Sequence, residues 1–452
     1  MIPRTLVAAI AALTPLAPAP ALAQRAAPTA VARSDALTAL TVEQRTAAIE
    51  AIIAAVREKY VFPDRVPVIE ARLRASLANG RYTTESPGNF AERVTEDLRE
   101  SSQDRHMYVN VDPAQYRLAV AATGAPEEDP AMAAYWRRLA VRSNHGLRDM
   151  RILPGNVRYL KVAGFNWVDD ESGAAYDAAA RFLRDGDAIV IDLRGNGGGS
   201  HGAVNYLISH FLAPNRLEMT FLQGGETPSQ SRSLGYLPAG RLTGRPLYVL
   251  IDGRTGSAAE AFAYDVQQFR LGRLVGAKTG GAANNNGFTP IAPGFMLSVS
   301  FGRPVHAVSQ SNWEGVGVSP DVAVAPQQAL DTALSLALAD LEGRTGADAA
   351  DRADWAWARS GIEARLHPVA VPADRLRPLA GTYGSNRVVF RDGALWLERA
   401  DRPTARLMPM TSDGLFLAEG YDDALRLRLT GPAMEIMWID EPASRTVPRS
   451  AD

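Results

Sequence analysis

The stretch that decides the fold is residues 188–199, AIVIDLRGNGGG. It opens with a continuous apolar run that ends at Asp192. A short apolar run of this kind is typical of a β-strand buried on both faces, as in a parallel sheet covered by helices. The glycines that follow allow the backbone to turn and to approach a ligand closely. The stretch therefore predicts a buried strand that leads into a glycine-rich loop.

A second apolar run, LYVLI at residues 247–251, repeats this pattern, and a β-rich stretch at 157–162 precedes both. Strands that alternate with helices predict an α/β core, which we expect to extend from about residue 154 to 345. The segments with helix-like composition lie between these strands and after them, at 174–183, 203–212 and 258–269.

The residues before the core have a different pattern. Residues 41–113 carry apolar side chains at helical spacing, such as Ile49, Ile52 and Ile53, and are expected to form an N-terminal helical domain. Residues 114–153 are interpreted as a connecting segment that contains one helix.

The residues after the core change pattern again. Residues 346–375 are interpreted as a linker. Residues 376–448 contain short apolar stretches of alternating pattern, separated by turn signals such as Asp392-Gly393 and Asp413-Gly414. We therefore expect a separate small β domain at this end of the chain.

The first residues have the three parts of a secretory signal peptide. Arg4 provides the positive charge, residues 6–16 are apolar, and Ala-Leu-Ala precedes Gln24. The apolar run is too short and too rich in proline for a membrane anchor. We expect residues 1–23 to be removed, residues 24–40 to form a flexible lead-in, and the mature protein to be periplasmic or secreted, with no membrane span.

The composition excludes several classes of site. The 48 Lys and Arg residues balance 50 acidic residues, for a net charge of −2, so nucleic acid is not an expected partner. The chain has no cysteine, which excludes a thiol nucleophile and a cysteine-ligated metal. Any imidazole base must be one of six histidines, namely His106, His145, His201, His210, His306 and His367.

The first candidate segment, GRTGSAAE at residues 253–260, links a predicted buried strand to a predicted helix. Ser257 would then lie at the helix N-terminus, where the dipole and free N–H groups favour developing negative charge. The N–H of Ala258 is well placed to stabilise an oxyanion. The same letters also form a capping box, with Ser257 as N-cap and Glu260 reaching back, so a purely structural role stays open.

Two further segments contain candidate functional groups. The glycine run 197–199 could cradle a phosphate or donate N–H groups to an oxyanion, although its spacing is neither that of a P-loop nor that of a dinucleotide-binding fingerprint. His106, in Asp104-Arg105-His106, is a candidate base, because a serine nucleophile needs one.

Taken together, these segments resemble the C-terminal-processing, or tail-specific, serine peptidase family. The resemblance covers roughly residues 40 to 340 and is greatest to the branch of the interphotoreceptor retinoid-binding protein modules and the tricorn protease core. The motifs that carry it are DLRGNGGG at 192–199, TGSAAE at 255–260, VGAKTGG at 275–281 and NWEGVGVSPD at 312–321.

The resemblance implies a crotonase- or Clp-like α/β core and a serine-type peptidase acting on peptides or proteins. It implies that Ser257 is the nucleophile, that His106 is the general base and that Glu314 orients that base. The oxyanion donors would be Ala258 and one of Gly197 and Gly198. This chemistry needs no metal or organic cofactor.

The chain departs from the classical processing proteases in two respects. Where they carry a catalytic lysine, this chain has alanine at position 282, and no PDZ-like segment precedes the core. A Ser-Lys mechanism through the nearby Lys278 therefore stays open, as do a non-catalytic module that binds an apolar ligand or peptide and a serine esterase. The oligomeric state does not follow from the sequence.

Overall fold

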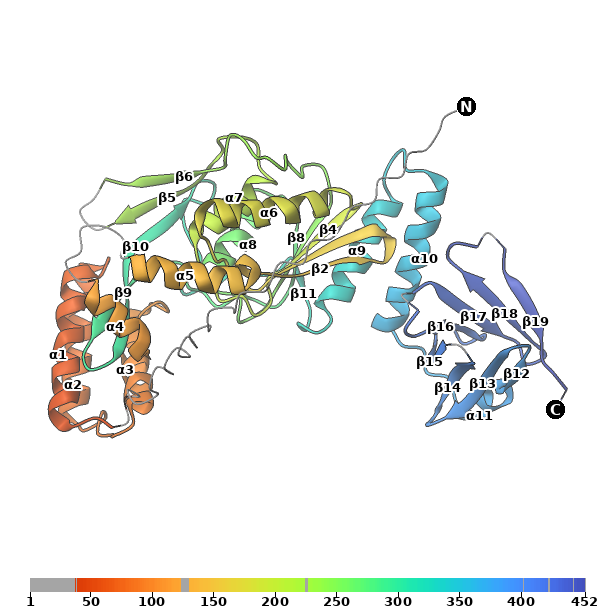
Figure 1. Ribbon diagram of the computed structural model, residues 1–452, viewed down its shortest axis with the longest axis horizontal. Coiled ribbons are helices and arrows are strands. Elements are labelled where there is room, and N and C mark those ends of the chain that lie inside the picture. The colour runs from red at the N-terminus through yellow and green to blue at the C-terminus, as the bar shows by residue number, and fades with distance from the viewer. Residues whose placement is uncertain are drawn as a thin grey trace, which may run out of the picture.

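The computed structural model describes residues 37, 39–122, 130–223, 227–400, 402–421, 423–441 and 443–451. The predicted signal peptide and most of the predicted lead-in lie outside the described residues. The described chain is elongated, with helices at one end, an α/β region in the middle and antiparallel strands at the other end (Figure 1).

The central sheet has six strands in the order β11-β8-β7-β4-β3-β2. Neighbouring strands are parallel except at one edge, where β2 pairs antiparallel with β3. The two predicted apolar runs are confirmed as β4 and β7, whose residues are all buried. The strands are β2 (Leu147–Leu153), β3 (Val157–Val162), β4 (Ala188–Asp192), β7 (Leu247–Ile251), β8 (Arg273–Gly276) and β11 (Val322–Ala323).

Helices cover both faces of this sheet, which is why β4 and β7 are apolar throughout. On β4, Ile189 and Ile191 belong to one hydrophobic core, whereas Val190 belongs to the other. The first core is closed by α6 (Asp169–Arg184), α7 (His201–Ser209) and α8 (Ala258–Gln268), and the second by α9 (Ala329–Glu342) and α10 (Ala349–Leu366).

The interpretation of residues 346–375 as a linker needs correction. They contain α10, an 18-residue helix. Trp355, Ala358 and Ile362 of this helix are buried in the core against α9. An amphipathic helix that buries such side chains is held by the hydrophobic effect, so this segment is part of the packed α/β region.

The N-terminal helices do not form a core of their own. They are α1 (Val42–Lys59), α2 (Val66–Ala78) and α3 (Pro87–Ser102). Their apolar faces share one hydrophobic core with Phe295, Leu297 and Val299, which lie about 200 residues later in β10.

A second sheet connects the N-terminal helices to the α/β region. Its order is β1-β10-β5-β6, with β9 also paired to β10. The pairing of β1 with β10 attaches the end of the helical region directly to the α/β region. The strands are β1 (Tyr108–Val111), β5 (Leu217–Gln223), β6 (Ser229–Arg232), β9 (Asn285–Ile291) and β10 (Phe295–His306).

The connecting segment contains more structure than the sequence predicted. The expected helix is α5 (Pro130–Arg142), and a further helix, α4 (Pro113–Ala121), precedes it. No helix in the described ranges combines the length and the apolar character that a membrane crossing needs.

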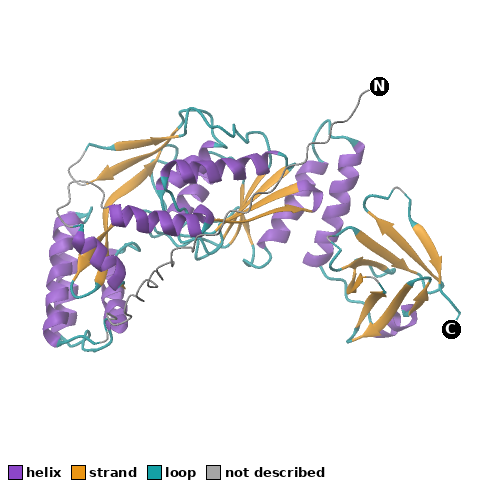
Figure 2. Ribbon diagram, in the orientation of Figure 1, coloured by secondary structure: helices purple, strands orange, loops and turns teal. Residues whose placement is uncertain are grey.

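The C-terminal region is an antiparallel sheet of eight strands in sequence order, β12 to β19 (Figure 2). A bridge between Tyr383 and Arg449 brings its two ends together, so that the sheet is nearly a closed barrel around its own core. The strands are β12 (Gly381–Tyr383), β13 (Asn386–Arg391), β14 (Ala394–Arg399), β15 (Arg402–Pro409), β16 (Leu415–Ala418), β17 (Leu425–Leu429), β18 (Ala433–Trp438) and β19 (Arg445–Pro448).

Candidate active site

Ser257 lies where the buried strand β7 leads into α8, at the N-cap of that helix. Its backbone has φ +53° and ψ −122°, a conformation that costs energy for a residue with a side chain. Strained positions of this kind concentrate at functional sites. The strain, together with the N-terminus of α8, makes Ser257 more than an ordinary helix cap.

Glu260 holds this strained turn. Its carboxylate accepts the N–H of Ser257 at 2.9 Å, which is one half of the predicted capping box. It also accepts the Thr279 hydroxyl at 2.5 Å and the N–H groups of Gly281 and Ala282 at 2.6 and 2.8 Å. Glu260 is fully buried, so these donors compensate the cost of removing its carboxylate from water. The Ser257 hydroxyl is 2.9 Å from a histidine ring nitrogen.

That nitrogen is Nε2 of His106. His106 lies between the end of α3 and the start of β1, and its own carbonyl accepts the hydroxyl of Ser298 from β10 at 2.5 Å. The β1–β10 pairing therefore carries the histidine from the helical region to the start of α8. Only 6% of the His106 residue is exposed, so the contact with Ser257 is sheltered from bulk water.

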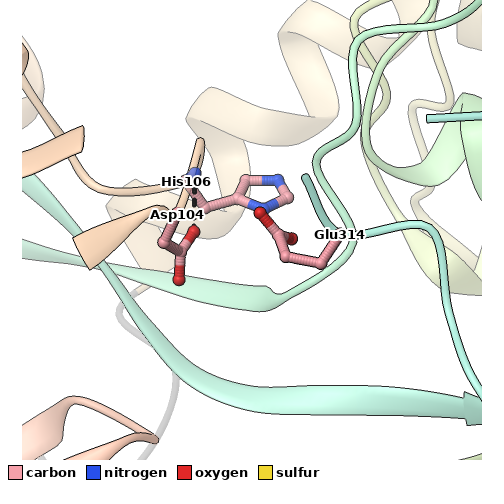
Figure 3. Close-up of side chains that lie close together, drawn as sticks. All are labelled: Asp104, His106 and Glu314. Carbon is pink, nitrogen blue, oxygen red and sulfur yellow. Dashed lines mark hydrogen bonds between the residues drawn. The ribbon is translucent and has the colours of Figure 1, made fainter. Parts of the chain in front are cut away.

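Two carboxyl groups flank the His106 residue, Glu314 toward the ring and Asp104 toward the backbone (Figure 3). Atoms of the three side chains lie within 4.8 Å of one another. The His106 Nδ1 atom forms no hydrogen bond to any group in the described residues, so Glu314 faces this nitrogen without a direct bond. This is the only such group of possible metal ligands in the described ranges, but both carboxylates already accept hydrogen bonds from the protein.

Glu314 is held by backbone donors. It accepts the N–H groups of Ala283 at 2.5 Å, Asn284 at 2.9 Å and Arg105 at 3.3 Å. Burial and the nearby Asp104 raise the pKa of Glu314, whereas these N–H groups oppose the rise. The carboxylate is thus tied both to the loop before β9 and to the residue that precedes His106.

The electrostatic surroundings of His106 are mixed. Burial lowers its pKa, because a charged imidazolium loses its hydration. Asp104 opposes this fall by attracting the charged form, and Arg99 adds to it. Glu314 and Arg105 also lie close, since Arg105 binds Glu314 through its N–H. The net effect lowers the pKa of His106, which favours the neutral imidazole, the form that can accept a proton.

The glycine-rich loop after β4 passes directly over Ser257. A side chain at Gly198, where φ is +111°, would come 2.7 Å from the Ser257 Cβ and 2.9 Å from the Ala258 nitrogen. Only glycine allows this approach. The Asn196 side chain fixes the loop, because it donates to the carbonyl of Val162 and accepts the N–H of Gly198.

This last bond distinguishes between the two glycines that were predicted as oxyanion donors. The N–H of Gly198 already donates to Asn196 Oδ1 at 2.9 Å, so it is not free for an oxyanion. The N–H groups of Ala258 and Gly197 donate to no group within the described residues. Both residues lie beside Ser257, and Gly197 also lines the adjoining cavity.

The cavity at Ser257 and His106 has a volume of about 620 Å³. Its wall includes five aromatic side chains, and Arg99 and Arg105 are the only Lys, Arg, Asp or Glu residues among the described residues that line it. Tyr108, Trp136, Phe165, Trp167 and Phe288 supply the aromatic surface. An apolar wall with a few convergent polar groups is typical of a site that binds an organic ligand.

Two other histidines are bonded to serine hydroxyls. His145 Nδ1 lies 2.8 Å from Ser172 Oγ, and His201 Nε2 lies 2.9 Å from Ser231 Oγ. None of these four residues lines the cavity. The His106–Ser257 pair differs from them because its serine is strained, lies at a helix N-terminus and faces a cavity.

Lys278, the alternative base, has an exposed side chain and is also absent from the cavity wall. Its position therefore offers no support for a Ser-Lys mechanism.

Several residues of the site carried no signal that singled them out in the sequence. Asp104 lies two residues before His106, and only the histidine of this segment was identified as a candidate functional residue. Asn284 belongs to Asn284-Asn285-Asn286, a run that reads as an ordinary loop. Arg99 and Trp136 read as helix-surface residues. A buried acid next to a candidate base could have been suspected for Asp104, but its burial depends on segments distant in the sequence.

Profiles of known families match two parts of the chain. Residues 156–324 match peptidase family S41. Residues 27–136 match the N-terminal domain of peptidase S41 in eukaryotic IRBP. The two matches together contain Ser257 and His106.

Solved structures that match parts of this chain include three proteins of low sequence identity. A lipoprotein from Streptococcus agalactiae is 15% identical with a TM-score of 0.46, over 66% of this chain and 97% of that chain. The photosystem II D1 C-terminal processing protease is 16% identical with a TM-score of 0.41, over 64% and 94%. The tricorn protease is 12% identical with a TM-score of 0.41, over 64% and 35%.

Proposed function

The chain belongs to peptidase family S41 and is a serine-type peptidase, and we propose that it hydrolyses exported peptides or proteins through an acyl-enzyme on Ser257. In this proposal His106 is the general base and Glu314 orients it. The observation that carries the proposal is the 2.9 Å contact between Ser257 Oγ and His106 Nε2 at the wall of a cavity. Nucleophile and base within hydrogen-bond reach are what acyl transfer requires.

In the acylation step, His106 Nε2 accepts the hydroxyl proton while Ser257 Oγ attacks the substrate carbonyl carbon. The negative charge that develops on the carbonyl oxygen is stabilised by the N–H of Ala258 and by the N-terminus of α8. His106 then donates the proton to the leaving amine, and the carbon–nitrogen bond breaks. A water molecule, deprotonated by the same nitrogen, hydrolyses the ester and regenerates Ser257.

During both steps the His106 ring becomes an imidazolium whose second N–H, on Nδ1, faces Glu314. The negative charges of Glu314 and Asp104 stabilise this ion. Since Nε2 must accept the Ser257 proton, the neutral ring carries its hydrogen on Nδ1. In this proposal the carboxylate of Glu314 selects that tautomer, and a small rotation on substrate binding would close the contact.

Labelling with a fluorophosphonate tests the proposal directly, because an activated serine hydroxyl attacks the phosphorus of the reagent, fluoride leaves, and the serine is phosphonylated. We expect a single modified residue, Ser257, on mapping the labelled protein. The two alternatives give other results. A non-catalytic binding module would leave Ser257 unlabelled in a folded chain. A serine esterase would be labelled at Ser257, but it would cleave an ester and not the matched peptide amide.

The pH dependence should follow His106. Because burial lowers its pKa, we expect kcat/KM to rise with pH along a limb that lies below the ordinary imidazole value of about 6.5. Activity should then change less through neutral pH than it would for an imidazole with the ordinary pKa, since more of the ring is already neutral there. The profile reports the coupled site as a whole.

The measurement is kcat/KM of the whole protein between roughly pH 4 and pH 9. A rising limb near the pKa of lysine, about 10.4, would instead indicate a Ser-Lys mechanism.

The charge of the cavity wall should set a substrate preference. Burial and the like charge of Arg105 lower the pKa of Arg99, so the two guanidinium groups repel each other. No acidic side chain of the described residues lines the cavity. We expect a peptide with a glutamate near the cleaved bond to have a KM up to about tenfold lower than its glutamine counterpart.

The R99Q/R105Q double variant should remove this preference while it still cleaves the neutral peptide. An unchanged ratio of the two KM values in this variant would contradict the role of the arginines.

A further inference from the structure

Three segments distant in the sequence meet beside the catalytic histidine. They are the end of the helical region at 102–106, the loop at 282–284 before β9, and the loop at 312–314. Contacts between such segments depend on specific hydrogen bonds, because apart from Ser102, the last residue of α3, none of these residues lies in a helix or a strand.

Asp104 makes one hydrogen bond within its own segment and one to another segment. Its Oδ1 accepts the backbone N–H of His106 at 2.9 Å, and its Oδ2 accepts the side-chain amide of Asn284 at 2.9 Å. Only 1% of the Asp104 residue is exposed. Burying a carboxylate costs free energy unless it is hydrogen-bonded in this way. A buried carboxylate next to the proposed base is therefore a candidate for a functional role.

Asn284 joins the two carboxylates. Its side chain donates to Asp104, and its backbone N–H donates to Glu314 Oε2 at 2.9 Å. Glu314 in turn accepts the N–H of Arg105, the residue before the base. The peptide groups on both sides of Arg105 are therefore held by a carboxylate each, and Asn284 sets the separation of the two carboxylates.

We propose that Asp104 and Asn284 are positioning residues for the base: together they hold the His106 loop against the Glu314 loop, and Asp104 supplies a second negative charge for the imidazolium. This inference rests on the proposed function of Ser257 and His106. It explains why the base can come from a region that packs outside the α/β core. Without the Asp104–Asn284 bond, no side-chain hydrogen bond among the described residues would join the 102–106 segment to the loop before β9.

The test is a reciprocal exchange. In D104N the side chain has one acceptor oxygen in place of two, so it can no longer accept both the His106 N–H and the Asn284 amide. In N284D two carboxylates face each other, and the hydrogen bond between the two side chains is lost. The double variant D104N/N284D restores a donor opposite an acceptor and keeps the net charge. D97N is the matched control, because Asp97 is a buried carboxylate of the same helical region that binds Tyr82 and Arg72, away from His106.

Two properties are measured on the whole protein. The first is kcat and KM with one peptide substrate as a function of pH. The second is the titration of the His106 ring, followed by nuclear magnetic resonance of histidine-labelled protein and assigned with H106Q. The titration does not depend on turnover, so it reports on the proposal even if the proposed function fails.

We expect D104N to lower kcat by roughly 10²-fold with little change in KM, because the base is misplaced and its charged form is less stabilised. The His106 titration and the rising limb of activity should both move to lower pH, since a negative charge near the ring is gone. N284D should lower kcat to a similar degree and move the titration to higher pH.

The double variant D104N/N284D should recover at least tenfold in kcat over either single variant. D97N should lower the melting temperature and leave kcat and the titration unchanged.

Strictly additive losses in the double variant would overturn the proposal, and so would a D104N titration that coincides with wild type. If D104N fails to fold, N284A removes the same hydrogen bond without adding a charge, and wild-type kcat in N284A would also overturn it. If S257A keeps turnover while the titration shifts appear as expected, the proposed function fails and the positioning role stands.

Discussion

Replacing Ser257 by alanine is expected to abolish hydrolysis while the fold is kept. The loss in kcat should be on the order of 10⁴-fold or more, because the acyl-enzyme can no longer form. The substitution removes one hydroxyl, whose contact in the structure is with His106 and not with the helix. As a helix cap alone, the hydroxyl would contribute about 1 kcal/mol to stability, so the melting temperature should change little. Turnover and thermal unfolding of the same preparation check both parts.

Ser86 offers a matched control. It is the N-cap of α3, and its side chain accepts the N–H of Asn89 at 3.3 Å. S86A should therefore lower stability by about 1 kcal/mol and leave turnover unchanged, the reverse of S257A. Wild-type turnover in S257A would mean that Ser257 is only a helix cap and that the nucleophile is elsewhere.

Replacing His106 by alanine should have an effect of similar size. Ser257 has no other base within reach among the described residues, so kcat should fall on the order of 10⁴-fold or more. Fluorophosphonate labelling of Ser257 should become correspondingly slow, because an ordinary serine hydroxyl is a weak nucleophile. The rate of labelling gives a second measure that needs no peptide substrate.

Two variants test the competing bases. His201 is bonded to Ser231, and the side chain of Lys278 is exposed, and neither lines the cavity. H201A and K278A should thus keep most of the wild-type turnover. If K278A were inactive while H106A kept its activity, the Ser-Lys mechanism would replace the one proposed.

In the proposed mechanism the helical region supplies the base, and the structure shows how this region is held. Phe90, Val94 and Leu98 of α3 are buried in the same core as Leu297 of β10. Burying such side chains stabilises by about 1.5 to 3 kcal/mol each, which fixes α3 against the strand that holds the His106 carbonyl. The base is thus attached to the α/β region by a shared core and not by a flexible connection.

Local patterns in the sequence determined much of the α/β region. The apolar runs of β4 and β7 could be recognised because a strand buried on both faces must be apolar throughout. The start of α8 at Ala258 followed from the capping pattern, in which Ser257 and Glu260 lie within one turn. These features depend on neighbours in the chain, and so a single sequence is enough to predict them.

The family motifs also singled out Ser257, His106 and Glu314, whose catalytic roles stay predictions. Sequence reasoning did not identify groups that are engaged in contacts which no local pattern predicts. Of the two glycines predicted as alternative oxyanion donors, Gly198 already donates its N–H to the side chain of Asn196, and no sequence pattern showed this contact. Residues 346–375 were interpreted as a linker, but α10 finds a partner in α9.

Only the tertiary structure decided how His106 reaches Ser257. The antiparallel pairing of β1 with β10 joins Tyr108 and Ser298, which are 190 residues apart in the sequence. The burial of Asp104 and its bond to Asn284 depend on that pairing, because both residues would be ordinary polar loop residues without it. The sequence by itself therefore determined which groups can carry the chemistry. The distances between these groups and their protonation states depend on long-range packing. The free energy of that packing comes from contacts between residues distant in the sequence, which no local pattern contains.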